Sequence, residues 1–135
     1  MGIKNSELDK IKKIQKFTDL VVWQEGHKLV LLIYKETEKF PLREKYGLTD
    51  QMRRAVVSIT SNIAEGFSRY SSKDKNHFYL TARGSLTELQ NQLLISKDVG
   101  NFTKEIFNKL AGQSVIVNKL LTGLLKATRL KSYEP

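Results

Sequence analysis

The first long pattern in the chain is a helical one. Apolar and aromatic residues recur between Leu20 and Phe40 at alternating spacings of four and three, and Pro41 ends the pattern. We expect Asp19 to cap this helix, because an aspartate at this position accepts hydrogen bonds from otherwise unpaired backbone amides. The face predicted to be buried consists of Trp23, His27, Val30, Tyr34 and Thr37.

Three further helices follow from the same spacing. We expect the second from Thr49 to about Arg69, with Gly66 beside its buried face, where it allows close packing. Ser71 is followed three positions later by an acidic residue, so it is expected to cap the third helix, and Thr103 starts the fourth. The predicted buried faces are Met52, Val56, Ile59, Ile63 and Phe67; then Phe78, Ala82, Leu86, Leu89, Leu93 and Ser96; then Ile106, Leu110, Gln113, Val117, Leu121 and Leu124.

Four amphipathic helices with short connections predict an all-α fold, an antiparallel up-down-up-down four-helix bundle. No stretch of the sequence shows the alternation of apolar and polar residues that is typical of a strand. We expect the bundle to occupy residues 19–130. Residues 1–18 are expected to form a basic, flexible N-terminal arm, and residues 131–135 a tail.

The composition fits one domain inside the cell. A chain of 135 residues can bury a sizeable core without disulfides, and it contains no cysteine, which also excludes thiolate metal sites. The longest apolar run, Leu29 to Tyr34, is far shorter than the roughly 20 residues that span a bilayer. The first residues lack the apolar core of a signal peptide. We therefore expect a cytoplasmic protein without a membrane segment.

The charge is strongly positive. The net charge is +9, from 23 Lys and Arg against 14 Asp and Glu. Such an excess attracts polyanions through counterion release and steering, but it also keeps a small protein soluble, and the composition does not separate the two. The candidate contacts to a nucleic acid are Arg53, Arg54, Arg69, Lys73, Lys119, Lys126 and Arg129. No aromatic residues are interleaved with the fourth-helix cations and no recognition-helix motif is present, so base-specific readout is not expected.

The second helix also carries a polar stripe beside its buried face. Its members are Arg54, Ser58, Asn62, Glu65 and Arg69. Glu65 precedes Arg69 by four residues, the favourable order for an ion pair on a helix. A single carboxylate and serines without a histidine in helical reach supply neither an acid–base pair nor an activated nucleophile. We interpret the stripe as a structural polar network at a helix interface.

The two histidines do not predict a metal site. A di-iron bundle needs two Glu-x-x-His motifs and further carboxylates, and neither His27 nor His77 has that spacing. We expect His27 to be a hydrogen-bonded residue of the buried face and His77 a first-turn residue of the third helix. The sequence therefore predicts no enzyme, no metal and no cofactor.

Several apolar residues fall away from the predicted buried faces. They include Leu32, Val57, Leu80 and Ile95, together with Thr60 on the second helix. A monomeric bundle needs one apolar stripe per helix, so additional stripes favour a homo-oligomer. Scattered apolar residues on a surface are also common.

Three stretches carry a resemblance to a known family. DLVVWQ near the start, YGLTDQMRRAVVSITSNIAEGFSR after Pro41, and GSLTELQNQL in the third helix occur in the order and spacing typical of it. They resemble the bacterial four-helix-bundle family encoded in intervening sequences of 23S ribosomal RNA, from Phe17 to about Arg129. The resemblance implies an up-down-up-down bundle, commonly a ring-like homopentamer, without known catalytic activity. The sequence departs from the family pattern at Gly26, where alanine is expected.

Two functions agree with these observations. The first is a non-enzymatic homo-oligomeric bundle that binds RNA or DNA through phosphate contacts on a basic surface. The alternative is a protein-interaction scaffold or accessory protein that binds no nucleic acid and whose charge serves solubility or an acidic protein partner.

Overall fold

Residues 14–131 are described by the computed structural model, and within that range the chain is helical without strands. The long helices are α2 (Val21–Thr37), α3 (Leu48–Phe67), α4 (Ser72–Asp98) and α5 (Lys104–Lys131). Two short 3-10 helices, η1 (Phe17–Asp19) and η2 (Leu42–Glu44), precede α2 and α3. Residues 1–13 of the predicted arm and 132–135 of the predicted tail lie outside the described range.

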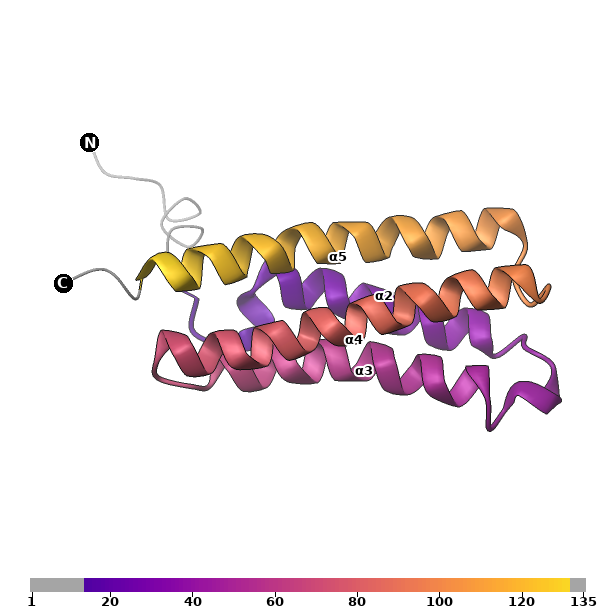
Figure 1. The fold of residues 1–135 in the computed structure, drawn as a ribbon, viewed down its shortest axis with the longest axis horizontal. Helices are drawn as coiled ribbons and strands as arrows, with labels where there is room; N and C mark the ends of the chain where they lie inside the picture. Colours follow the sequence, from indigo (N-terminus) through magenta and orange to yellow (C-terminus); the bar gives the residue numbers. More distant parts are fainter. Residues whose placement is uncertain (1–13, 132–135) are drawn as a thin grey trace.

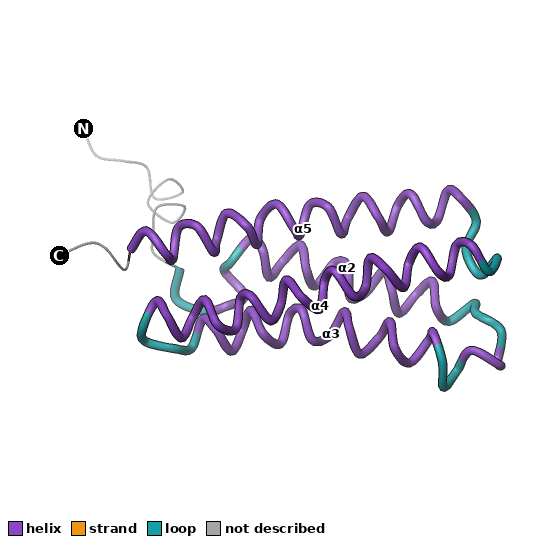
Figure 2. Tube along the Cα trace, viewed as in Figure 1, coloured by secondary structure: helices purple, strands orange, loops and turns teal. Residues whose placement is uncertain are grey.

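The four long helices pack side by side into an elongated bundle (Figure 1), which confirms the predicted all-helical fold. Short connections join them, and the segment that contains η2 between α2 and α3 is the longest of the three (Figure 2). None of the helices in the described part of the chain is both long enough and apolar enough to cross a bilayer.

Hydroxyl side chains cap two helices as the sequence predicts. The Ser71 hydroxyl accepts a hydrogen bond from the Asp74 amide at 3.0 Å, and the Thr103 hydroxyl accepts one from the Ile106 amide at 3.2 Å. The prediction for Asp19 was wrong. Its carboxylate accepts hydrogen bonds from the backbone amides of Gln15 and Lys16, which precede it. Asp19 is therefore the last residue of η1, and α2 begins two residues later.

A glycine ends α4. Gly100 has a φ of +85°, a left-handed conformation that favours glycine. Its amide donates to the Lys97 carbonyl and the next amide, of Asn101, donates to the Ser96 carbonyl, which satisfies two carbonyls at the helix end. The Asn101 side chain then donates to Glu44 at 2.7 Å. This bond ties the α4–α5 connection to η2.

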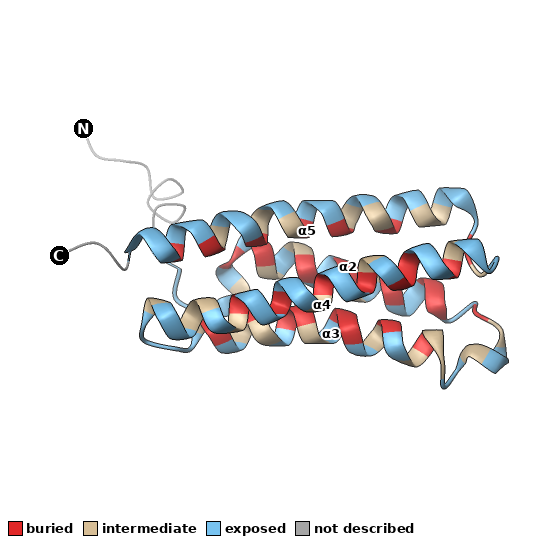
Figure 3. Ribbon diagram, in the orientation of Figure 1, coloured by how far each residue is buried: buried red, intermediate tan, exposed pale blue. Residues whose placement is uncertain are grey.

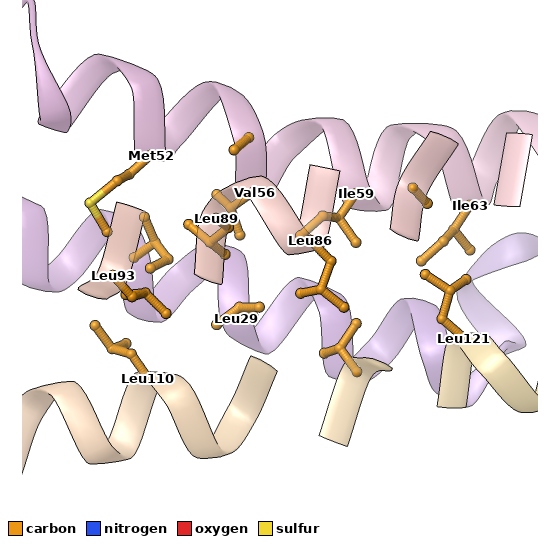
Figure 4. Packing of buried hydrophobic residues seen from close by; sticks show 14 of the residues in the cluster. Leu29, Met52, Val56, Ile59, Ile63, Leu86, Leu89, Leu93, Leu110 and Leu121 are labelled. Atoms are coloured by element: carbon orange, nitrogen blue, oxygen red, sulfur yellow. The ribbon is translucent and has the colours of Figure 1, made fainter. Parts of the chain in front are cut away.

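Each long helix turns one apolar face toward a common core (Figure 3). Burying a leucine or isoleucine side chain contributes about 1.5–3 kcal/mol, so these faces hold the bundle together. Most of the buried apolar positions on α3, α4 and α5 belong to the predicted faces. The side chains that meet at the centre (Figure 4) are Leu29, Met52, Val56, Ile59, Ile63, Leu86, Leu89, Leu93, Leu110 and Leu121.

The buried face of α2 differs from the predicted one. Leu29 and Ile33 are fully buried, while His27 is exposed and stacks on the half-buried Trp23 with ring centroids 4.8 Å apart. Both series follow the same spacing of three and four, so periodicity alone does not distinguish them. The residues that α2 buries are Val22, Gly26, Leu29, Ile33, Glu36 and Thr37.

Close contact with α3 explains which face of α2 is buried. A Cβ atom at Gly26 would lie 3.1 Å from the Cγ2 atom of Thr60, which is tighter than ordinary contact. Thr60 is therefore buried between the two helices, although we expected it to lie away from the buried face. Aromatic side chains do not fit at so close a contact, and Trp23 stays only half-buried beside Phe17 and His27.

Gly66 makes a still closer contact with α4. A Cβ atom there would lie 2.6 Å from the Cε1 atom of Tyr79 and 3.1 Å from the carbonyl oxygen of Lys75. Tyr79 is only 2% exposed, and burial raises its pKa to about 12. The phenol thus stays protonated at ordinary pH while its ring fills the space that a side chain would need.

We expect Gly66→Ala to lower the free energy of unfolding by about 1–3 kcal/mol, because the added methyl group overpacks the Tyr79 ring. Gly112→Ala is the matched control, because its methyl group would meet nothing within 4 Å. The free energy of unfolding of that control is expected to rise by up to about 1 kcal/mol, because alanine has a higher helix propensity than glycine. Urea unfolding followed by circular dichroism measures both, and equal stability of the two variants would contradict the close contact.

Candidate functional site

The seven candidate cations lie in different parts of the bundle. Arg53 and Arg54 lie in the first two turns of α3, near the end of α2. Arg69 and Lys73 lie at the α3–α4 turn, which is at the opposite end (Figure 1). Lys119, Lys126 and Arg129 lie along the second half of α5, which ends beside that turn.

Arg53 is engaged by the end of α2. Its Nε donates to the Thr37 hydroxyl at 3.0 Å, and its Nη2 donates to the Tyr34 carbonyl at 3.3 Å and to Glu38 at 3.2 Å. The guanidinium also lies 4.6 Å from the centroid of the Tyr34 ring. A cation here donates hydrogen bonds to carbonyls at the helix C-terminus and is attracted to the negative end of the helix dipole. These contacts make Arg53 a residue that joins α3 to α2.

The neighbouring Arg54 makes a weaker contact. Its side chain is 81% exposed and pairs with Asp50 one turn earlier on the same helix, at 3.3 Å. An exposed pair of this kind contributes only a few tenths of a kcal/mol, since solvent screens it. In the single chain Arg54 does not contact the rest of the predicted polar stripe within the described residues.

Part of the predicted polar stripe joins α3 to α4. The hydroxyl groups of Ser58 and Ser85 lie 2.8 Å apart across the two helices. The Asn62 amide donates to the Ser58 carbonyl at 2.8 Å and to its hydroxyl at 3.1 Å. All three side chains are partly buried. Ser85 is absent from the predicted stripe, because only the packing brings the two helices to the same level.

The lower part of the stripe faces the α3–α4 turn. Arg69 pairs with Glu65, and its guanidinium lies 4.7 Å from the centroid of the Phe78 ring on α4. Both members of the pair remain nearly half exposed. This contact holds the Arg69 side chain at the surface of the turn.

Cations gather where α3 meets α4 and α5 ends, a region that we call the basic end. Residues 65–75 and 126–131 carry six cations against two carboxylates. Burial lowers the pKa of the Lys75 ammonium, and the nearby charge of Lys131 lowers it further. The cations are Arg69, Lys73, Lys75, Lys126, Arg129 and Lys131, and the carboxylates are Glu65 and Asp74.

A groove of about 290 Å³ lies between α4 and α5 next to the basic end. Three cations and two leucines line it, so it offers both charge and apolar contact. The Asn76 amide donates to the Leu125 carbonyl at 3.3 Å, which joins the two walls, while its buried Oδ1 has no hydrogen-bond partner among the described residues. The lining residues are Asn76, Leu80, Arg83, Thr122, Leu125, Lys126 and Arg129.

Arg83 and Lys131 were not predicted as members of this region. Arg83 lies on α4, and its distance from the α5 cations depends on how the two helices pack. Lys131 belongs to α5, although we placed it in the tail. A longer fourth helix in the prediction would have included Lys131, although it lies on a different face of the helix from Lys119, Lys126 and Arg129.

The histidines and carboxylates lie apart from one another. Among residues 14–131, no three His, Cys, Asp or Glu side chains come together in a way that could hold a metal ion. His27 stacks on Trp23, and the edge of His77 meets Phe78 with ring centroids 5.4 Å apart. The contacts of both histidines thus involve aromatic rings.

Comparison with known proteins identifies relatives of most of the bundle. The family described as 23S rRNA-intervening sequence protein matches residues 18–123. The chain is also similar to the crystal structure of a protein of unknown function from the S23 ribosomal protein family of Bacteroides thetaiotaomicron. The two share 23% sequence identity with a TM-score of 0.71, over 78% of this chain and 99% of the other, which shows a common fold. No curated protein matches the chain.

We expect Arg53→Ala to lower the free energy of unfolding by about 1–3 kcal/mol, because partly buried hydrogen bonds to the end of α2 are lost. Arg54→Ala is the matched control, and its exposed ion pair is expected to account for less than about 1 kcal/mol. Urea unfolding of both variants measures the difference. A larger loss in Arg54→Ala than in Arg53→Ala would contradict these assigned roles.

Proposed function

The chain belongs to the 23S rRNA-intervening sequence protein family, and from this premise we propose that it is a non-enzymatic, oligomeric bundle that binds RNA or DNA at the basic end. The observation that carries the proposal is the six cations against two carboxylates in that region. The binding groups of the proposed site are Arg69, Lys73, Lys126 and Arg129 of the basic end, joined by Lys119 further along α5 and by Arg83 of the groove.

The electrostatics of the basic end favour phosphate contacts. Lys73 and Lys126 are exposed, so a phosphate can approach their charged groups without a large rearrangement. Each phosphate that a lysine or arginine neutralises releases condensed counterions, which makes binding favourable and dependent on salt. Contacts of this kind orient a protein on a strand without reading its sequence. Arg53 is left out of the site because α2 engages its guanidinium, and Arg54 because it pairs with Asp50 in the first turns of α3, away from the basic end.

We further propose that consecutive helices run in opposite directions. Arg53 in the first turns of α3 contacts the last turn of α2. Ser96 near the end of α4 donates to the sulfur of Met52 near the start of α3, at 3.4 Å. Asn76 near the start of α4 donates to the carbonyl of Leu125 near the end of α5. Each contact joins the beginning of one helix to the end of another, which supports an up-down-up-down order.

The proposed oligomer is a homopentamer in the cytoplasm. Apolar side chains remain exposed on the outer faces of the helices, including Leu80 at 49%, Ile95 at 41% and Ile116 at 44%. A second copy of the chain would remove such surface from water, as in other obligate interfaces. The number of five rests on the family resemblance of the sequence motifs.

Charge reversal tests the proposed site. We expect the triple variant Lys119→Glu, Lys126→Glu, Arg129→Glu to weaken binding of a labelled RNA more than tenfold at about 50 mM salt, because attraction to phosphates becomes repulsion. Fluorescence anisotropy measures this, and the dependence of wild-type affinity on salt is expected to be steep. Circular dichroism is expected to show unchanged helix content in the variant.

The control variant carries the same change in charge elsewhere. Lys35→Glu, Arg43→Glu, Lys104→Glu alters three exposed residues near the opposite end of the bundle. An equal loss of affinity in both triple variants would show that binding depends on net charge alone. No binding by the wild-type chain at about 50 mM salt would instead favour a protein-interaction scaffold.

Light scattering at several concentrations tests the oligomer. We expect a mass near five times the 15.5 kDa of one chain. The double variant Leu80→Asp, Ile95→Asp is expected to lower the mass without loss of helix, because it places charges in the apolar contact. A mass of one chain at every concentration would contradict the proposal.

A further inference from the structure

One aromatic side chain at the basic end is entirely open to solvent. Tyr70, in the α3–α4 turn, has a relative exposure of 102%. Both faces of its ring are therefore accessible. An isolated tyrosine with this exposure contributes nothing to the core of the bundle, so its position is not explained by packing of the single chain.

The backbone around Tyr70 is held firmly by its neighbours. The Arg69 amide donates to the Gly66 carbonyl at 3.1 Å as α3 ends, and the Ser71 hydroxyl caps α4 directly afterwards. Lys75 reaches back from α4 and donates to the Phe67 carbonyl at 2.7 Å. The turn is thus short and hydrogen-bonded on both sides, so it presents Tyr70 at a defined place.

Cations flank this ring on both sides along the chain. Arg69 precedes it, and contacts with Glu65 and Phe78 keep the Arg69 guanidinium at the surface of the turn. Lys73 follows it and is exposed. An accessible aromatic ring among cations is the arrangement with which proteins bind unpaired strands, because bases stack on the ring while cations contact the phosphates.

We propose that Tyr70 is a stacking platform for a base of an unpaired nucleic-acid strand, and that the basic end therefore prefers single-stranded over double-stranded nucleic acid. The inference rests on the proposed function and adds the class of ligand. In a duplex the faces of the bases are covered by their neighbours, so only an unpaired base can offer its face to the tyrosine ring. Stacking of this kind tolerates any sequence, since every base has a π-face.

The test compares three probes and three variants. The probes are a short unstructured RNA, the DNA strand of the same sequence, and the duplex of that DNA, each labelled for fluorescence anisotropy. We expect the two single strands to bind more tightly than the duplex. Tyr70→Ala is expected to weaken single-strand binding by about fivefold to a hundredfold, the range for one lost base stack, and to leave duplex binding unchanged.

Tyr46→Ala is the matched control, because Tyr46 is 86% exposed, follows a lysine and lies at the opposite end of the bundle. It is expected to leave the affinity for single strands unchanged. Tyr70→Phe is expected to bind as the wild type does, because the phenyl ring retains its π-face without the hydroxyl group. Ultraviolet crosslinking followed by mass spectrometry is expected to place the nucleotide on the peptide that contains Tyr70.

The outcomes separate the two proposals. Binding of single strands and duplex with equal affinity, or an unchanged affinity in Tyr70→Ala, would overturn the stacking role while the basic end remains a phosphate-binding surface. An equal loss in Tyr46→Ala and Tyr70→Ala would overturn it as well. No binding of any probe at low salt would overturn the proposed function itself.

Discussion

The close packing of α3 against α2 and α4 is the constraint on which the rest of the structure depends. Two glycines make this packing possible. The absence of a side chain at Gly26 leaves room for Thr60, and its absence at Gly66 leaves room for the ring of Tyr79. At each point a side chain from the facing helix occupies the space that a Cβ atom would need. Because α3 is fixed on both sides, its apolar face enters the core along its length, and its last residues meet α4 at a defined turn.

The same packing decides where charge remains unbalanced. At the start of α3, Arg53 and Arg54 are paired with Glu38 and Asp50 and serve local contacts. At its other end, among residues 65–75 and 126–131, Glu65 and Asp74 are outnumbered three to one by cations of the turn, α4 and α5. A surface with such a surplus in one place attracts phosphates more effectively than the same charge spread over the molecule. The proposed role of the basic end follows from this asymmetry.

Sequence patterns predicted the helices better than they predicted which faces meet. Thr103 and Ser71 cap α5 and α4 as expected, because capping requires only neighbours along the chain. The buried face of α2 was misassigned, since two sets of residues share the same spacing and only the contact with Thr60 distinguishes them. In the candidate site, the α5 cations were recognisable from their helical stripe. Arg83 and Ser85 were not, because they join the site across a helix interface.

The sequence by itself determined the helical class, the positions of most helix ends, the apolar faces of α3, α4 and α5, and the excess of positive charge. These properties depend on the composition, on the spacing of residues and on hydrogen bonds between neighbours along the chain, so they do not require the helices to have packed. Only the tertiary structure decided which face of α2 is buried, which arginines are engaged by other helices, and that Tyr70 lies entirely open to solvent. These features depend on distances between residues far apart in sequence, and such distances exist only once the helices have packed.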